Sequence, residues 1–432
     1  MNNIKMAYNW IGPRGPLPNI EIPNILNLAD VSIGGNLTSN RIWIEGLWHI
    51  FRDYFDLSPT ANIQDSDTFI YPLTLHWRVN FDAYFTIGDG ILEYAHPSND
   101  ILHSIKQGNG YILIDHSPEA FVYDKHLNVI HSYFLAHGIP LYKILYLTGC
   151  MNTEEVYNNY CIRHQIPNDP RYRLKLVSYP CSIDSASRDI ENLESEPFYD
   201  STLVPKKLFL SWNRRHKAHR NMLALLFDKN DLLNYSYFSM SKEEPEFPDR
   251  KFEDIFEDKW LEMFNLTRGD VIDLVKKLPL VVDGETVITK MMKGTQSTSE
   301  NFYENSLVSI ITETNFLENE ISMTEKSIKP VKEKHPFIMI GVKGTLKAYH
   351  NLGYKTFSNF WSEEYDNIED SWERLREIIR ICKEISKWDS EKILEFKKKV
   401  KPILDYNFQV AKGGISKSAA NNIIEHITRH KC

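Results

Sequence analysis

The chain has 432 residues, of which 42% are hydrophobic and 25% are charged, and this composition is ordinary for a globular protein with more than one core. Its 19 glycines and 20 prolines are too few for a collagen-like or low-complexity chain. The formal net charge of −8 argues against a protein that binds nucleic acid through a broad basic face, although it leaves room for a local basic cleft.

The five cysteines are scattered and form no CxxC pair, a pattern typical of a reducing cytoplasm. No apolar run approaches the roughly 18 residues that cross a membrane, and the first residues lack the apolar segment of a signal peptide. We therefore expect a cytoplasmic protein without a membrane partner.

In the first half, residues 111–114 and 141–150 are apolar runs that predict buried strands, and residues 151–164 predict a helix after the second run. Strands that alternate with helices indicate an α/β domain with a parallel sheet. Residues 185–206 are polar and acidic and predict a linker. We therefore place a first domain at residues 1–200.

The second half again alternates between predicted strands and helices, so we place a second α/β domain at residues 201–365. Its predicted strands are 206–212, 306–314 and 336–341, and its predicted helices begin near 216, at Ser322 or Thr324, and at 344. Residues 366–432 predict helices that pack back on the domains. One of these starts at Asp370, and a second ends near Pro402.

The densest basic motif is NRRHKAHR, residues 213–220, which follows a predicted strand and opens a helix. Open α/β sheets bind ligands at the carboxyl ends of their strands, and arginine supplies planar paired donors for phosphate. Arg214, Arg215 and Arg220 are therefore candidate phosphate ligands. The alternative interpretation is a solvated basic turn.

A second motif combines an acidic strand end, Glu313, with the helix start Thr324-Glu325-Lys326 and with Lys329 one turn further on. Thr324 can cap the helix while its hydroxyl faces a phosphate, and Glu325 can accept hydrogen bonds from sugar hydroxyls. The two lysines are three residues apart and share one helix face. The alternative interpretation is a charged surface helix.

A third motif supplies candidate proton acceptors. Asp115 and Glu119 follow the predicted strand 111–114, at the end of the strand where ligands bind. A carboxylate there can take the proton of an attacking hydroxyl group, and Asp115 is our first choice for this general base. The alternative is that Asp115 caps a turn and Glu119 is solvated.

The chain contains one DxD sequence, Asp65-Ser66-Asp67. Two such carboxylates can hold Mg²⁺ or Mn²⁺ against a diphosphate. This pair precedes a predicted strand, whereas ligands bind beyond strand ends. We therefore interpret it as an Asp-rich turn and expect no metal site.

The order and spacing of the pieces in the second domain resemble the donor-binding half of GT-B glycosyltransferases, especially the α-1,3-fucosyltransferase-like family. The pieces are an acidic strand end, Thr-Glu-Lys, a Lys-Pro helix, and a His-Pro-Phe-Ile strand before a glycine. The chain is also similar to glycosyltransferase-like proteins of large phages and giant viruses, which carry an Asn-Arg-Arg…His-Arg segment. The resemblance covers about residues 205–360, and of the family's strand-end triplet only the glutamate is present, at Glu313.

This resemblance implies two Rossmann-like domains facing a cleft, with the C-terminal helices as a tail. Residues 1–200 would then form the acceptor side, and residues 201–365 would bind the nucleotide-sugar donor. It also implies an enzyme that transfers a hexose or pentose from a nucleotide-sugar to a hydroxyl group, with inversion and without a metal or other cofactor. In this picture Glu325 holds the donor ribose or sugar, and Lys326 binds the diphosphate. One of the three arginines neutralises the leaving diphosphate, and Glu313 is the acidic residue on the donor side.

The acceptor stays open at this point. It is either a glycan or a hydroxylated base in viral DNA, and a viral protein would act in the host cytoplasm. Two other classes of function are compatible with the same residues: a non-catalytic protein that binds nucleotide-sugars, and a structural viral protein.

Overall fold

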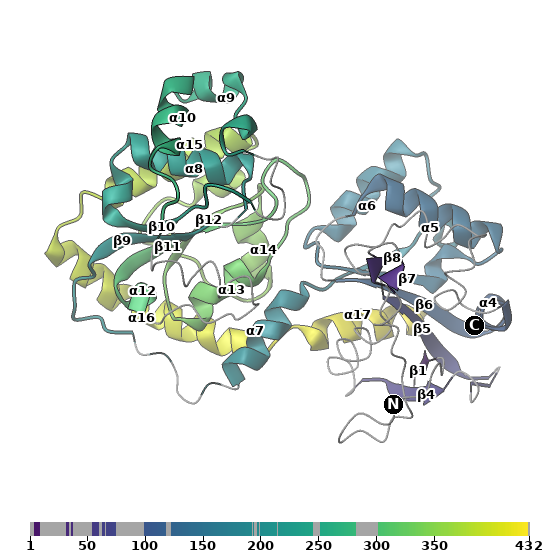
Figure 1. Ribbon diagram of the computed structural model, residues 1–432. Helices are drawn as coiled ribbons and strands as arrows, with labels where there is room; N and C mark the ends of the chain where they lie inside the picture. Colours follow the sequence, from purple (N-terminus) through teal and green to yellow (C-terminus); the bar gives the residue numbers. More distant parts are fainter. Residues whose placement is uncertain are drawn as a thin grey trace. The chain divides into compact units, whose positions relative to one another are not determined.

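The computed structural model describes residues 4–8, 32–33, 36–37, 54–59, 63–64, 66–74, 99–117, 122–191, 193, 197, 199–213, 215–244, 251–281 and 301–430. Contacts divide the chain into unit 1, residues 1–184 with 414–432, and unit 2, residues 185–413. Each unit is built on a parallel sheet with helices around it (Figure 1). The predicted α/β class with C-terminal helices is confirmed.

Unit 1 contains a parallel sheet with the strand order β4-β1-β5-β6-β7-β8. The strands are β1 (Lys5–Tyr8), β4 (Asp56–Pro59), β5 (Thr68–Thr74), β6 (Asn109–His116), β7 (Ile144–Thr148) and β8 (Lys175–Ser178), beside the short hairpin β2 (Ser32–Ile33) and β3 (Asn36–Leu37). The helices are α4 (Asn99–Gln107), α5 (Asp124–Ala136), α6 (Thr153–Arg163) and α17 (Ser416–Arg429), with 3₁₀ turns η4 (Leu141–Lys143) and η5 (Pro170–Tyr172). Helix α7 (Cys181–Glu191) begins in unit 1 and continues into unit 2.

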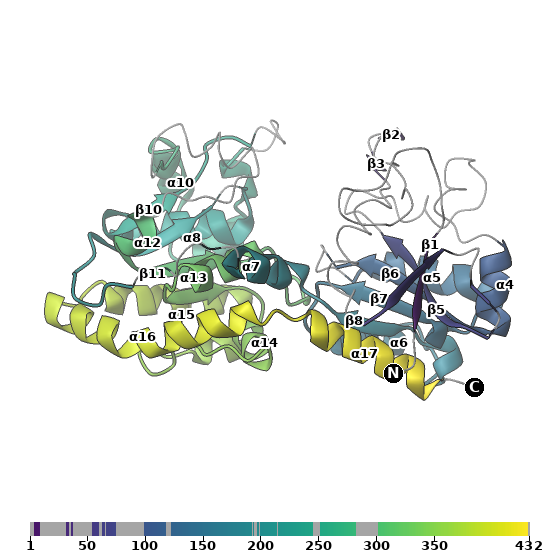
Figure 2. The ribbon, with the colours of Figure 1, turned by 90° about the horizontal axis from the view of Figure 1, so that it is seen from below.

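The central strand β6 shows why this sheet needs helices on both faces. Side chains alternate across a strand, and here both sets are apolar and fully buried. Ile112 and Ile114 pack into one core with side chains of α4, α5 and α6. Tyr111 and Leu113 pack into a second core with α17. Figure 2 shows α17 running alongside the sheet of unit 1.

Helix α17 comes from the end of the chain and completes the core of unit 1. Ala419, Ala420, Ile423 and Ile427 are buried against the sheet. The buried Asp184 carboxylate holds the beginning of this helix, because its Oδ1 accepts hydrogen bonds from the amides of residues 415 (2.5 Å) and 416 (3.2 Å). One carboxylate thus ties α17 to the start of the chain's path into unit 2.

Unit 2 contains a parallel sheet with the strand order β10-β9-β11-β12. The strands are β9 (Lys207–Trp212), β10 (Ser236–Ser239), β11 (Ser306–Thr312) and β12 (Phe337–Ile340). The helices are α8 (Ala218–Lys229), α9 (Asp258–Met263), α10 (Arg268–Val275), α12 (Asn301–Glu304), α13 (Glu325–Lys332), α14 (Thr345–Asn351), α15 (Ser371–Ile385) and α16 (Ser390–Lys412), with 3₁₀ turns η6 (Leu232–Tyr235), η7 (Glu253–Ile255) and η8 (Glu364–Asn367). In Figure 1, α8 and α15 lie above this sheet and α13 and α16 lie below it.

Several helix boundaries follow the predicted caps. Thr324 caps α13 through its side chain, which accepts a hydrogen bond from the Lys326 amide. Asp370 caps α15 by accepting from two amides of its first turn. Gly353, with φ of +91°, follows the end of α14, where a left-handed residue is expected.

Two predictions about elements are corrected, and one strand was missed. The predicted linker 185–206 begins inside α7, because Ile183 and Ile190 bury apolar side chains that hold this segment as a helix. The predicted helix end near Pro402 is wrong, because α16 continues to Lys412. Pro402 is exposed, so water can bond the carbonyl that loses its donor, while Val400, Leu404 and Phe408 stay buried on the other side. Strand β10 was not predicted.

Among the residues that the structure describes, no helix is long and apolar enough to cross a membrane.

The two contact-defined units meet at residue 184, whereas the sequence analysis placed the first boundary at residue 200 and kept residues 366–432 as a separate group. In the structure α15 and α16 belong to unit 2, and α17 belongs to unit 1.

We predict that Ile423→Ala destabilises unit 1 by about 2–5 kcal/mol, because it leaves a cavity against the sheet. Native-state hydrogen exchange is the measurement, and amides of β6 and β7 should exchange faster while those of β9 and β11 do not change. Glu425→Ala, an exposed change on the same helix, is the control and should stay within about 0.5 kcal/mol of the parent. Equal exchange of β6 in both variants would contradict the role assigned to α17.

Candidate functional site

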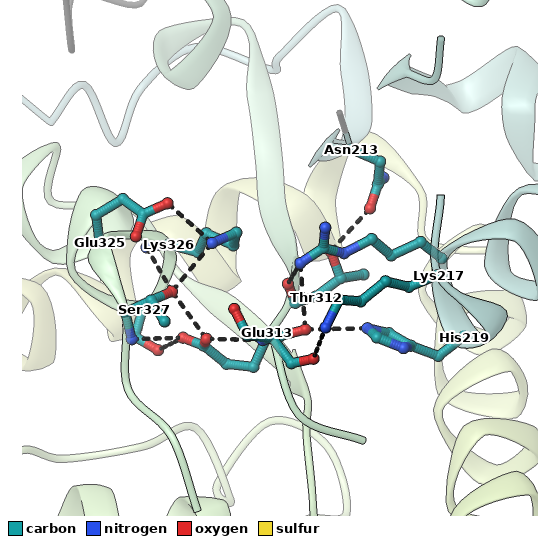
Figure 3. Close-up of polar contacts among 11 residues, drawn as sticks. Asn213, Lys217, His219, Thr312, Glu313, Glu325, Lys326 and Ser327 are labelled. Atoms are coloured by element: carbon teal, nitrogen blue, oxygen red, sulfur yellow. Dashed lines mark hydrogen bonds and ion pairs between the residues drawn. The ribbon is translucent and has the colours of Figure 1, made fainter. Parts of the chain in front are cut away.

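The candidate site lies where β9 and β11 end, at the carboxyl edge of the unit 2 sheet (Figure 3). Asn213 directly follows β9 and locks the two strand ends together. Its Oδ1 accepts a hydrogen bond from the Thr312 hydroxyl at 2.8 Å, and its Nδ2 donates to the Ser211 hydroxyl at 3.0 Å. Polar side chains that follow either strand are therefore held at one place on the sheet.

Glu313, the first residue after β11, is 1% exposed and points its carboxylate at the beginning of α13 (Figure 3). Oε1 accepts from the Thr324 amide at 3.2 Å and from the Ser327 hydroxyl. Oε2 accepts from the Thr324 hydroxyl at 2.8 Å and from the Thr314 amide at 3.1 Å. The carboxylate therefore receives four hydrogen bonds from the chain itself.

Three basic side chains of the segment that opens α8 reach the carbonyl groups of residues 312–314 (Figure 3). Lys217 Nζ donates to the Thr314 carbonyl at 2.7 Å, and His219 Nε2 lies 3.0 Å from the Glu313 carbonyl. Arg220 Nη2 donates to the carbonyls of residues 312 and 313 at 3.2 and 3.3 Å. These bonds fasten α8 to the end of β11.

Burial sets the charges of these groups. It lowers the pKa of Arg220 to about 10, against the opposing charge of Glu313, so the guanidinium stays charged at neutral pH. It lowers the pKa of Lys217 to about 8, and the nearby Arg220 charge adds to this effect. It lowers the pKa of His219 so far that the imidazole is neutral. Of these three groups, Arg220 is charged, His219 is neutral, and Lys217 titrates near pH 8.

Lys326 is a partly exposed cation at this strand edge. Its Nζ donates to the Thr324 hydroxyl at 3.2 Å and to Glu325 Oε1 at 2.8 Å. The Lys326 side chain is 27% exposed and that of Glu325 is 50% exposed. Burial opposes ionisation of Glu325, but the Lys326 charge prevails and lowers the pKa of that carboxyl. Lys329 follows on α13, where burial lowers its pKa.

Arg220 also carries a buried donor that the chain leaves open. Its Nε has no hydrogen-bond partner among the residues that the structure describes. The Arg220 side chain is 4% exposed, so water has little access to this nitrogen. A buried polar group normally has a partner, and an oxygen atom of a ligand would supply one here.

The structure brings together five of the predicted donor-side residues: Arg220, Glu313, Thr324, Glu325 and Lys326. Arg215 is exposed on the same segment, and Arg214 lies outside the described residues. The sequence analysis did not assign roles to Lys217, His219 and Ser327. The signal for the first two was the basic run that contains them, and the signal for Ser327 was its position one helical turn after the Thr324 cap.

The predicted base Asp115 lies near the end of β6 in unit 1. Its carboxylate is buried and accepts a hydrogen bond from the Ser117 amide at 3.0 Å. Burial raises the pKa of Asp115, although the bonds from Ser117 oppose the effect. The neighbouring His116 contacts the Tyr146 hydroxyl at 2.8 Å, and burial lowers its pKa to about 3. Glu119 lies outside the described residues.

The DxD sequence is described only in part. Asp67 accepts hydrogen bonds from Lys5 Nζ at 2.7 Å and from the Gln64 amide at 2.8 Å, as expected for a turn before a strand. Asp65 lies outside the described residues. The part of the chain that the structure describes contains no group of three His, Cys, Asp or Glu side chains suited to a metal ion. Metal independence stays a prediction.

Comparisons with known proteins found no matching protein-family model and no matching curated protein. Two solved structures are similar at the level of the chain trace. One is α,α-trehalose 6-phosphate synthase from Burkholderia multivorans, with a TM-score of 0.41, 10% identity, and coverage of 85% of this chain and 71% of that one. The other is the N-terminal domain of trehalose-6-phosphate phosphatase from Candida albicans, with a TM-score of 0.45, 9% identity, and coverage of 84% and 70%. Because both identities are 10% or less and both TM-scores are below 0.5, these structures assign no function to this chain.

We predict that Lys217 titrates near pH 8 in the folded protein. The side-chain carbon signals of labelled lysine, followed by NMR from pH 6 to 11, are the measurement. Lys217→Arg should remove the signal that moves near pH 8, whereas Lys399→Arg, an exposed change on α16, should not. A Lys217 signal that moves only near the ordinary lysine value of about 10.4 would contradict the buried, cation-flanked environment described here.

Proposed function

We propose that the protein is a glycosyltransferase that moves a hexose or pentose from a nucleotide-sugar to a hydroxyl acceptor, with the donor held by unit 2. The observation that carries the proposal is the group of cations Lys217, Arg220 and Lys326 at the carboxyl ends of β9 and β11. Strand ends of this kind bind ligands in open α/β sheets, and these cations match the charge of a diphosphate.

Arg220 and Lys326 have different parts in the proposed reaction. When the bond between sugar and diphosphate breaks, negative charge develops on the leaving oxygen, and cations already in place stabilise it without reorganisation. Arg220 supplies a fixed charge and the open Nε donor. Lys326 is partly exposed and supplies a second charge that a ligand can reach. These side chains take the place that a metal ion has in other transferases, so we propose a metal-independent reaction.

Glu325 is proposed to bind hydroxyl groups of the donor ribose or sugar. Its side chain is half-exposed, and its lowered pKa keeps it ionised at neutral pH. A carboxylate of this kind accepts two hydroxyl hydrogen bonds at once. Binding would also replace part of the contact between Glu325 and Lys326, which leaves the lysine for the phosphate.

Asp115 of unit 1 is proposed as the base that takes the proton from the acceptor hydroxyl, which then attacks the sugar with inversion. Its raised pKa makes it a better proton acceptor than an ordinary aspartate. We therefore expect activity to fall as the pH drops through the pKa of Asp115, because the protonated form cannot accept a proton.

The proposed acceptor is a glycan, with a hydroxylated base in viral DNA as the second candidate. The net charge of −8 favours the glycan, since duplex DNA binds proteins mainly through phosphate contacts. Binding of duplex DNA that weakens steeply between 50 and 200 mM salt would favour the second candidate. A cytoplasmic location, in the host if the protein is viral, belongs to this proposal.

The first test is thermal stability against a panel of nucleoside diphosphates and nucleotide-sugars in EDTA and in Mg²⁺. A ligand at about 100 times its Kd adds roughly 2.7 kcal/mol, which raises the midpoint by about 5 °C. We expect one nucleotide to give this shift in EDTA as well as in Mg²⁺. No shift with any of them would favour a structural protein, and binding without sugar transfer would favour a non-catalytic binding protein.

We predict that Lys326→Ala weakens binding of the stabilising nucleotide by about 10- to 100-fold, because a hydrogen bond to a charged group is worth about 1.5–3 kcal/mol. Calorimetric titration is the measurement. Lys399→Ala removes an exposed lysine paired with Glu395 and serves as the matched control, with binding unchanged. Equal affinity of Lys326→Ala and the control would remove Lys326 from the donor site.

We predict that Asp115→Asn lowers turnover by about 100- to 10,000-fold, because general-base catalysis contributes that much. The amide can still accept the hydrogen bond from Ser117, so folding and donor binding should not change. Turnover at saturating donor is the measurement, with Asp169→Asn, a change of a partly exposed side chain in the same unit, as the control. Full turnover of Asp115→Asn would mean that another group is the base.

A further inference from the structure

The carboxylate of Glu313 has no capacity left for a ligand. An ionised carboxylate offers about four acceptor sites, and here the amides of Thr314 and Thr324 and the hydroxyls of Thr324 and Ser327 fill four. At 1% exposure the side chain is also closed to solvent. The family resemblance implies that Glu313 acts on the donor side. Its carboxylate therefore acts there without contacting the donor directly.

The hydrogen-bond chain from Glu313 leads to Lys326. The Thr324 hydroxyl donates to Glu313 at 2.8 Å and accepts from Lys326 Nζ at 3.2 Å. The same hydroxyl caps α13 by accepting from the Lys326 amide at 3.4 Å. Because a hydroxyl group has one proton, its donation to Glu313 turns its lone pairs towards the lysine. Glu313 thus sets the direction in which Thr324 presents its acceptor.

The backbone of Glu313 is also held by hydrogen bonds, through both its amide and its carbonyl group. Its amide donates to the Ile340 carbonyl at 2.9 Å, so the backbone continues the pairing of β11 with β12. Its carbonyl accepts from Arg220 and lies within hydrogen-bond distance of His219. One residue therefore joins α8 and α13 to the end of β11. A carboxylate at a helix beginning is also favourable for the helix dipole.

We infer that Glu313 is a positioning residue: it does not contact the donor but fixes the first turn of α13, and through Thr324 it places the Lys326 ammonium at the diphosphate. This inference rests on the proposed function and deepens it, because it assigns Glu313 to positioning Lys326 and not to direct contact with the donor.

Inorganic pyrophosphate separates the two roles, because it has phosphate groups but no ribose and no sugar. If Glu313 positions Lys326, Glu313→Gln weakens pyrophosphate and the best nucleoside diphosphate by the same factor, about 10-fold. If Glu313 binds the ribose directly, the nucleoside diphosphate weakens and pyrophosphate does not, which would overturn the inference. Calorimetric titration in EDTA, at a temperature where each variant is folded, gives both numbers.

The matched control is Glu363→Gln. Glu363 lies in the same unit, and its partly buried carboxylate accepts from the Thr356 hydroxyl at 2.5 Å and from the Phe357 amide at 2.8 Å. The chemical change is identical, but these bonds do not reach α13, so pyrophosphate affinity should change less than 2-fold. A residue with a purely structural role would lower the melting temperature and leave the affinity of the folded protein unchanged, and that result would also overturn the inference.

Ser327→Ala is the second variant, because it removes one donor to Glu313 and keeps the carboxylate. We expect a smaller loss of pyrophosphate affinity, about 3-fold, and no further loss when Ser327→Ala is added to Glu313→Gln, since both changes act on one contact. Additive losses in the double variant would count against a shared mechanism.

Hydrogen exchange keeps the inference testable if the parent protein binds neither pyrophosphate nor a nucleotide, which would defeat the proposed function. The amides of Thr314 and Thr324 donate to the Glu313 carboxylate, so they should exchange at least 5-fold faster in Glu313→Gln. Amides of β12 are the internal control and should not change. Unchanged exchange at Thr324 would overturn the positioning role regardless of ligand binding.

Discussion

The arrangement of unit 2 depends on one buried carboxylate. Glu313 accepts four hydrogen bonds at the beginning of α13, while its own carbonyl accepts from Arg220 of α8. These bonds connect the end of β11 to both helices, beside the contacts of Lys217 and Arg220 with the neighbouring carbonyl groups. Removing a partner from such a group leaves buried donors unsatisfied, at about 1–3 kcal/mol each. The position of Lys326 follows from this constraint, because its ammonium bonds the same Thr324 hydroxyl.

Burial has different effects on the ionisable side chains at the strand ends of the two units. At the strand edge of unit 2, Arg220 keeps its charge although it is buried, because acidic neighbours offset part of the desolvation. Near the end of β6 in unit 1, burial makes His116 neutral and raises the pKa of Asp115. A charged environment suits a phosphate ligand, and a desolvated carboxyl suits proton transfer. The proposed division between donor binding and base catalysis follows from these two environments.

Local patterns predicted much of the fold. The caps at Thr324 and Asp370 depend on side chains next to the helices that they begin, so the sequence contains the whole interaction. The basic run at residues 213–220 likewise predicted a site at the end of β9. What the sequence could not reveal were contacts over long separations. The length of α16 beyond Pro402 depends on the burial of Leu404 and Phe408, and no local pattern shows that α17 packs against β6.

The packing of α17 also bears on the synthesis of the protein. A ribosome makes residues 185–413 before it makes α17, so every residue of unit 2 exists before the core of unit 1 can be completed. Until then, the face of β6 that carries Tyr111 and Leu113 lacks its covering helix. Domains usually finish folding in their order along the chain, but here unit 1 cannot complete its core until all residues of unit 2 have been made. This apolar face of β6 therefore lacks its covering helix for most of translation. We expect chaperones that bind apolar surfaces to associate with the nascent chain during that time.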